Sequence, residues 1–338
     1  MKTQILKPTK TAIEKACKLI MAGEVVAVPT ETVYGLAGSS FDSKAIKKIF
    51  IAKGRPQDNP LIVHISNIQQ LKDVVSVVPQ DAQKLAEAFW PGPLTIIMPK
   101  NSKLAPETSA GLDSVGVRMP SHPVAKQIIE KTGPFSAPSA NISGRPSPTT
   151  AEDVFADMNG RIPLIIDGGE CDAGVESTVV SCLEDTPIIL RPGVVTKSMM
   201  EQILNKKVKI AKAITQEVKE NQKVLSPGMK YKHYAPNAKV VLIKSNLNQF
   251  IKYVHAHAST DTFVLVFDGE QKHFNTKALT YGKIDDQKAQ AHNIFACLRQ
   301  LDKLGAKEVF VRCPSANDIG LAVYNRLIRS SGFNIIEL

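Results

Sequence analysis

Two cations, Lys53 and Arg55, stand on a predicted loop in the stretch KGRPQDNPLIVH, residues 53–64. The stretch follows an apolar pattern of helical spacing, and Asn59 forms a turn before a short buried strand that ends in His64. Two fixed cations followed by such a strand suit a site that binds a polyanion. Most pairs of basic residues are solvated surface charges, so charge alone leaves both interpretations open.

Other polar side chains follow predicted strands. The run EVVAVP, residues 24–29, leads into PTETVYGL, where the hydroxyl of Thr32 serves either a turn or a ligand. In open α/β proteins, ligands commonly contact the residues that follow the carboxyl ends of strands. In SVGVRMP, residues 114–120, alternation places the two valines on one face and Arg118 on the other. Arg118 therefore faces either solvent or a cleft.

The stretch FSAPSANISGRPSPTT, residues 135–150, is rich in hydroxyl groups and prolines and runs into a helix capped by Thr150. It is either a flexible linker or a loop whose donors contact phosphate or ribose. Two later predicted strands also have candidate ligands at their ends. ESTVV has two hydroxyl residues near its start, and IILRPG places Arg191 before a Pro-Gly turn. The sequence thus distributes candidate anion ligands over several strand ends.

Composition indicates a globular chain with room for two domains, because 338 residues are 43% hydrophobic and 22% charged. There is no run of eighteen apolar residues to span a membrane and no secretory signal pattern at the start. We therefore expect a cytoplasmic protein with no membrane partner.

The five cysteines include no CxxC pair, which argues against a disulfide framework and a zinc ribbon, and we expect no metal held by protein ligands. The net charge of +10 is unevenly divided: residues 1–215 carry 25 Lys and Arg against 21 Asp and Glu, and residues 216–338 carry 17 against 11. Such an excess is typical of proteins that meet anions such as nucleotides or RNA.

The elements that must position these residues follow from periodicity. Apolar spacing predicts helices over residues 9–22 and 80–90, the second with Leu85, Ala88 and Phe89 facing inward. Residues 239–338 alternate strands and helices, which indicates a small parallel three-layer unit. We expect a catalytic domain over residues 1–212, a linker over 213–238 and a C-terminal domain over 239–338.

Familiar nucleotide and hydrolase signatures are missing from the sequence, including GxxxxGK[ST], the protein-kinase set, HExxH and GxSxG. If the protein binds ATP, side-chain cations and hydroxyl-rich loops must hold the phosphates in place of a glycine-rich cradle.

Seven motifs occur in the order PTETVYGL, KGRPxxNPL with the following His, VGVRMP, APSANISG, ESTVV, LRPG and SPGMKYKHYAP. In this order they resemble the YrdC-like threonylcarbamoyladenylate synthases in their two-domain form, over essentially the whole chain. Each motif is weakly specific, but seven in register are a specific signature. The resemblance implies an α/β fold: an N-terminal YrdC-like twisted open mixed sheet flanked by helices, a linker, and a small Rossmann-like parallel domain.

The resemblance also implies a nucleotidyltransferase reaction. L-Threonine, bicarbonate or CO2 and ATP would give threonylcarbamoyl-AMP and pyrophosphate, with Mg2+ expected on the phosphates and no protein ligand assigned to it. A tRNA-threonylcarbamoyl transferase complex would then use the product to form N6-threonylcarbamoyladenosine in tRNA. Direct binding of tRNA by this chain stays open.

Site residues follow from the same resemblance. Lys53 and Arg55 are the expected catalytic residues, and Tyr231 and Tyr234 of the linker would close over the site as a lid, with Tyr234 preferred as the ATP contact. The expected ATP-binding residues are Lys53, Arg55, Asn59, Ser114, Ser139, Asn141, Thr149, Arg191, Tyr231 and Tyr234. The expected L-threonine-binding residues are Thr32, His64, Arg118, Ser139 and Ser177.

Two other functions compete with this one. The basic chain could be a module that binds tRNA or double-stranded RNA without catalysis, although aromatic residues are only 6% and no RNA-binding signature occurs. It could also be related to hydrogenase-maturation carbamoyltransferases, which contain YrdC-like domains, but the zinc-finger cysteines and acylphosphatase-like segment expected there are missing.

Overall fold

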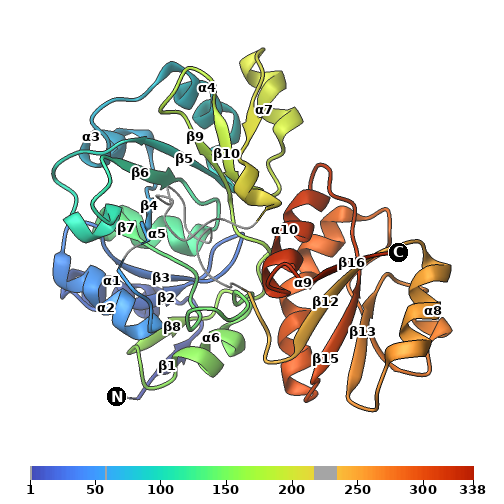
Figure 1. Ribbon diagram of the computed structural model, residues 1–338. Coiled ribbons are helices and arrows are strands. Elements are labelled where there is room, and N and C mark those ends of the chain that lie inside the picture. The colour runs from blue at the N-terminus through green and yellow to red at the C-terminus, as the bar shows by residue number, and fades with distance from the viewer. Residues whose placement is uncertain (1, 58, 217–233) are drawn as a thin grey trace.

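The computed structural model describes residues 2–57, 59–216 and 234–338, whose strands form one sheet of eleven strands and one of five (Figure 1). The larger sheet mixes parallel and antiparallel neighbours, and the five strands of the smaller sheet are all parallel. The predicted fold class, a mixed sheet followed by a small parallel α/β unit, is confirmed.

The larger sheet has the strand order β1-β8-β2-β3-β7-β4-β6-β5-β9-β10-β11. Its strands are β1 (Gln4–Leu6), β2 (Val26–Val28), β3 (Gly35–Ser39), β4 (Ile62–His64), β5 (Leu94–Pro99), β6 (Ser114–Arg118), β7 (Phe135–Ser136), β8 (Leu164–Ile166), β9 (Thr178–Ser181), β10 (Ile188–Arg191) and β11 (Lys209–Ile210).

Helices cover both faces of the sheet around β2 and β8. Alternation along the chain sends Val26 and Val28 into the core beneath α1 (Lys10–Met21) and α5 (Pro123–Thr132). It sends Val25 and Ala27 into the core on the opposite face, beneath α2 (Ser43–Lys53) and α6 (Ala151–Met158). The predicted strand in the run EVVAVP is therefore confirmed, and both of its faces are buried.

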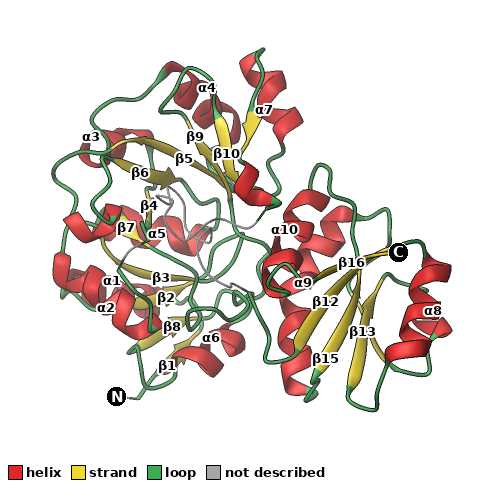
Figure 2. Cartoon of the chain, in the orientation of Figure 1, coloured by secondary structure: helices red, strands yellow, loops and turns green. Residues whose placement is uncertain are grey.

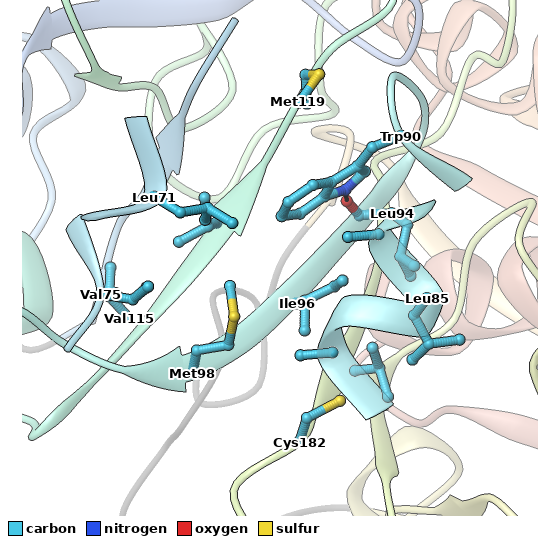
Figure 3. Close-up of a cluster of buried hydrophobic side chains, with 14 of the residues drawn as sticks. Leu71, Val75, Leu85, Trp90, Leu94, Ile96, Met98, Val115, Met119 and Cys182 are labelled. Atoms are coloured by element: carbon cyan, nitrogen blue, oxygen red, sulfur yellow. Dashed lines mark hydrogen bonds between the residues drawn. The ribbon is translucent and has the colours of Figure 1, made fainter. Parts of the chain in front are cut away.

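The other half of the larger sheet has one face packed against helices. Leu85 of α4 (Gln80–Phe89) packs on Leu94, Ile96 and Met98 of β5 in the cluster shown in Figure 3, which also receives side chains from α7. The predicted inner face of the helix over residues 80–90 was wrong at Ala88, which is exposed, whereas Ala82 and Ala86 are buried. The remaining helical elements of this half are α3 (Leu71–Val74), α7 (Lys197–Leu204), η1 (Ile68–Gln70), η2 (Pro106–Ser109) and η3 (Lys212–Ile214).

The opposite face of these strands carries polar side chains in one row. Register pairs His64 of β4 with Arg118 of β6, and Arg118 with Thr95 of β5. Because successive side chains alternate between faces, these residues lie opposite the cluster formed by α4 and β5. The pleat of three neighbouring strands thus presents an imidazole, a guanidinium and a hydroxyl group to the same side.

The smaller sheet has the order β14-β13-β15-β12-β16, with helices on both faces (Figure 2). Its helices α9 (Gln287–Lys303) and α10 (Gly320–Ser330) lie toward the larger sheet, and α8 (Leu247–His257) covers the far face (Figure 1). The core beneath α9 and α10 also includes Val33 and Val175 from the part of the chain that forms the larger sheet. The other elements are β12 (Lys239–Lys244), β13 (Thr262–Val266), β14 (Lys277–Thr280), β15 (Glu308–Arg312), β16 (Ile335–Glu337) and η4 (Gln271–His273).

The larger sheet ends in sequence at Ile210, and the smaller sheet begins at Lys239. The proposed limits of the domains, residues 1–212 and 239–338 around a linker, stay a prediction. None of the helices in the described residues has both the length and the apolar surface needed to cross a membrane.

Replacing Ile96 with alanine should destabilise the protein, because the Ile96 side chain of β5 is fully buried beneath α4. Loss of a large aliphatic side chain from such a core costs about 2–5 kcal/mol. Ile51→Ala is the matched control, since Ile51 is 73% exposed on α2. Urea denaturation should show a lower midpoint for Ile96→Ala and a change below about 0.5 kcal/mol for Ile51→Ala. Equal midpoints would show that this cluster does not stabilise the fold.

Candidate active site

One cavity, on the polar face of β4, β6 and β5, collects most of the residues that the sequence singled out. Four cations line it, and Glu176 is the acidic side chain among its described lining residues. The predicted site residues found there are Thr32, Lys53, Arg55, His64, Arg118, Ser139, Asn141, Ser177, Arg191 and Tyr234.

Helix α2 delivers the first two cations. Lys53 is its last residue rather than part of a loop, and Gly54 then takes a left-handed conformation, φ +61°, that turns the chain toward Arg55. Lys53 donates hydrogen bonds from Nζ to the backbone oxygens of Ser139 and Asn141, the latter at 2.9 Å. Burial, reinforced by the neighbouring Arg55, holds the pKa of Lys53 well below its usual value. An arriving polyanion would favour the charged ammonium.

Arg118 is buried and contacts three groups. It donates from Nη1 to Thr32 Oγ1 at 2.8 Å and from Nε to the Gly92 oxygen at 3.3 Å, and its Nη2 pairs with Glu31 Oε1 at 2.7 Å. Its guanidinium carries five N–H groups, so two remain for a ligand. A carboxylate that enters the cavity therefore meets an Arg118 guanidinium whose orientation is already fixed.

His64 is neutral at physiological pH. Burial first, and the nearby Arg118 second, lower its pKa from 6.5 to about 3. Its Nδ1 lies 3.2 Å from the Ile62 oxygen, and its ring stacks on Phe135. A hydrogen bond from Nδ1 leaves Nε2 as an acceptor, which suits a hydroxyl or amine donor on a ligand.

Strand β9 begins beside the fourth cation. Ser177 Oγ lies 2.8 Å from Thr95 Oγ1, and Arg191 donates from Nη2 to Ser177 Oγ at 3.2 Å and from Nε to the Ser177 oxygen at 3.1 Å. The Ser177 hydroxyl group therefore contacts both β5 and β10, and these contacts fix its orientation beside the Arg191 guanidinium.

Of the two linker tyrosines, Tyr234 lines the cavity and is buried, with φ +64°. Its ring packs on Phe295 of α9 at 5.2 Å between centroids, and the next residue, Ala235, donates its backbone N–H to the Gly144 oxygen. Tyr231 lies outside the described residues.

Three predicted ATP ligands are not among the described residues that line the cavity: Asn59, Ser114 and Thr149. All three are buried. Ser114 begins β6 and shares the face of Arg118, but it lies four residue steps away along the strand, about 13 Å. Thr149 Oγ1 finds no hydrogen-bond partner among the described residues. The assignment of these three residues to ATP stays a prediction.

Sequence reasoning missed three residues that organise the cavity: Glu31, Thr95 and Glu176. Glu31 pairs with Arg118, and Glu176 accepts a hydrogen bond from Ser147 Oγ at 2.5 Å. Each glutamate precedes a predicted ligand, Thr32 or Ser177, inside a motif that the sequence had already singled out. Their position next to a predicted ligand could have identified both glutamates from the sequence. Their pairing with arginines from distant segments could not have been identified in this way.

The cavity offers poor ligands for a metal held by the protein alone. The described residues contain no group of three or more His, Cys, Asp or Glu that could hold an ion. Glu176 is already engaged by Ser147 and by an arginine of α10. What the site can do is bind and orient anions, through four cations supported by hydroxyl and backbone groups.

Comparison with known proteins gives matches over nearly the whole chain. A family model described as telomere recombination matches residues 18–193, and one described as threonylcarbamoyl-AMP synthase, C-terminal domain, matches residues 195–332. The threonylcarbamoyl-AMP synthase of Bacillus subtilis is 41% identical over 341 residues, which cover 99% of this chain and 97% of that protein. The protein of that name from Pyrococcus abyssi is 40% identical and covers 96% of each.

A solved structure agrees with these matches. The crystal structure of P. abyssi Sua5 complexed with L-threonine has a TM-score of 0.89 and 38% identity, and the match covers 100% of this chain and 99% of that one.

The low pKa of His64 predicts how stability depends on pH. Between about pH 3 and its unfolded value of 6.5, the unfolded chain binds a proton that the folded chain excludes. Stability should therefore fall as pH falls below 6.5, by about 1.4 kcal/mol per unit from this residue. His64→Asn should flatten this part of the profile in urea titrations at pH 5 and 7. The control His255→Asn, at an exposed position, should follow the unchanged protein; identical slopes for all three would refute the assignment.

Proposed function

Because the chain belongs to the threonylcarbamoyl-AMP synthase family in its two-domain form, we propose that its cavity joins L-threonine, bicarbonate or CO2, and ATP into threonylcarbamoyl-AMP and pyrophosphate. The observation that carries the proposal is the convergence of Lys53, Arg55, Arg118 and Arg191, from three segments far apart in sequence, on one cavity.

The reaction places anions against anions. The threonine amine adds CO2 and loses a proton to give a carbamate, and a carbamate oxygen then attacks the α-phosphorus of ATP. The new P–O bond replaces the bond to pyrophosphate, which leaves with the electron pair, so the enzyme is a nucleotidyltransferase. No strong nucleophilic side chain is needed, because the main requirements are neutralisation of charge and alignment of the reactants.

On this proposal Lys53 and Arg55 neutralise the phosphates and are the catalytic pair. Ser139 and Asn141 lie beside them, since the backbone oxygens of both accept from Lys53. Arg191 would contact ATP from the opposite wall, and Tyr234 would cover the nucleotide. Asn59, Ser114, Thr149 and Tyr231 complete the proposed ATP-binding set.

The threonine would lie along the row formed by β4 and β6. Arg118 would bind the threonine carboxylate through the N–H groups that do not already contact Glu31, Thr32 or Gly92. The neutral His64, with Thr32, Ser139 and Ser177, would line the rest of the threonine pocket.

Mg2+ would arrive with ATP and would supply further neutralisation of the phosphate charge. The described cavity residues supply no set of carboxylates for it, so we assign it no protein ligand and no step. We further propose that a tRNA-threonylcarbamoyl transferase complex consumes the product, with tRNA as the final acceptor, and that the protein acts in the cytoplasm.

An RNA-binding module without catalysis is less well supported. Proteins grip RNA through exposed cations that reach the phosphate backbone. The four cavity cations are each at most 9% exposed, which suits a small ligand that enters a cavity.

Arg118→Met should weaken threonine binding far more than ATP binding. It is best made together with Glu31→Gln, because removing the arginine alone would leave a buried carboxylate unpaired. Relative to Glu31→Gln alone, the threonine concentration for half-maximal pyrophosphate release should rise roughly tenfold or more, the loss of a charge-assisted hydrogen bond. Equal increases for threonine and ATP would contradict the role of Arg118.

Lys53→Ala combined with Arg55→Ala should abolish threonine-dependent pyrophosphate release while circular dichroism remains that of the folded protein. The reason is that both charges facing the phosphates are lost. Lys44→Ala with Lys126→Ala removes the same formal charge from exposed positions and should leave the rate unchanged. Substantial turnover by the Lys53 and Arg55 double variant would overturn the proposed chemistry.

A further inference from the structure

Helix α10 of the smaller sheet inserts one fully buried arginine into the wall of the cavity. Arg326 donates from Nε to Glu176 Oε2 at 3.0 Å and from Nη1 to the Pro192 oxygen at 2.7 Å. Its Nη2 lies 2.9 Å from the same carboxylate oxygen. A residue about 150 positions away in sequence thus supplies the counter-charge for a glutamate that lines the cavity.

Glu176 is an acidic residue in a cavity that is lined by basic residues. It is the acidic side chain among the described residues lining a cavity that we propose binds ATP and a carbamate. Burial raises the pKa of Glu176, but Arg326, Arg191 and the hydrogen bond from Ser147 together bring it below its usual value, so the carboxylate is ionised. Without a counter-charge this carboxylate would repel the substrates.

The same pair fixes neighbouring parts of the site. Glu176 accepts from Ser147 in the hydroxyl-rich loop and precedes Ser177, which Arg191 contacts. The Arg326 guanidinium also lies over the ring of Tyr234, 5.6 Å from its centroid. Displacement of Arg326 would therefore disturb the loop, the start of β9 and the covering tyrosine together.

Helix α9 contacts the same loop directly, beside Ser147. Arg299 donates from Nη2 to the Pro146 oxygen at 2.5 Å and to Asp157 Oδ2 at 2.9 Å. The backbone N–H of Ala235 reaches the Gly144 oxygen. The loop that follows Ser139 and Asn141 is therefore contacted directly by α9, and α10 reaches it through Glu176.

We propose that Arg326 is a positioning residue for the reaction: it compensates the charge of Glu176, so that this wall of the cavity accepts the triphosphate and keeps Ser147 and Ser177 in place. The smaller sheet thereby contributes to substrate binding without touching the substrate. This inference rests on the proposed function.

The test uses the full chain and compares Arg326→Met, Glu176→Gln and the double variant. Arg326→Met should weaken ATP binding roughly tenfold or more, measured by calorimetry and as the KM for ATP, because it leaves a buried carboxylate unpaired. Adding Glu176→Gln removes that carboxylate's charge and should restore ATP binding to within about threefold of Glu176→Gln alone. An arginine that merely stabilises the interface would show no such rescue.

Arg329→Met is the matched control. Arg329 is a buried arginine on the same helix that donates to the Ala213 oxygen, 2.8 Å away. Glu176→Gln should not improve ATP binding in the Arg329→Met background. Equal rescue in both backgrounds would overturn the proposal, and so would unchanged ATP binding in Arg326→Met.

If Arg326→Met does not fold, the double variant decides the question. It should fold and release pyrophosphate at nearly the rate of Glu176→Gln alone, and a folded but inactive double variant would overturn the inference. Failure of the proposed function would look different, because the unchanged protein would then release no pyrophosphate in response to threonine.

Discussion

The site depends on basic side chains that are buried inside the protein. Burying a charge is costly unless it is paired and hydrogen-bonded. Here two of the four cavity cations are held largely by neutral oxygens: Lys53 by the backbone of Ser139 and Asn141, and Arg191 by Ser177. Neutral partners satisfy the N–H groups without cancelling the charge. The cavity therefore presents basic groups whose charged forms an incoming anion stabilises.

The topology explains how the distant segments meet. Strands β4, β6 and β5 lie side by side, so register alone aligns His64, Arg118 and Thr95 on one face. Helix α2 ends beside this face and delivers Lys53 directly before a left-handed glycine. The larger sheet supplies the floor of the cavity, and the loop after β7, with the helices of the smaller sheet behind it, forms a wall.

The sequence predicted the fold class and much of the cavity, because alternation and motif order report on local structure. It failed where the outcome depends on packing between distant elements. Ala88 was placed inside from helical spacing, yet it is exposed since the apolar face of α4 is centred on Leu85. The partners of Arg118 and Glu176 could not be foreseen, because local periodicity carries no information on which buried charges neutralise each other.

The core beneath α9 and α10 contains Val33 and Val175, which belong to the part of the chain that forms the larger sheet. Arg326 and Arg299 add polar contacts across the same boundary. The two halves thus cohere through complementary surfaces as well as through the peptide that connects them. Such an arrangement favours reassembly of the two parts when they are produced as separate chains.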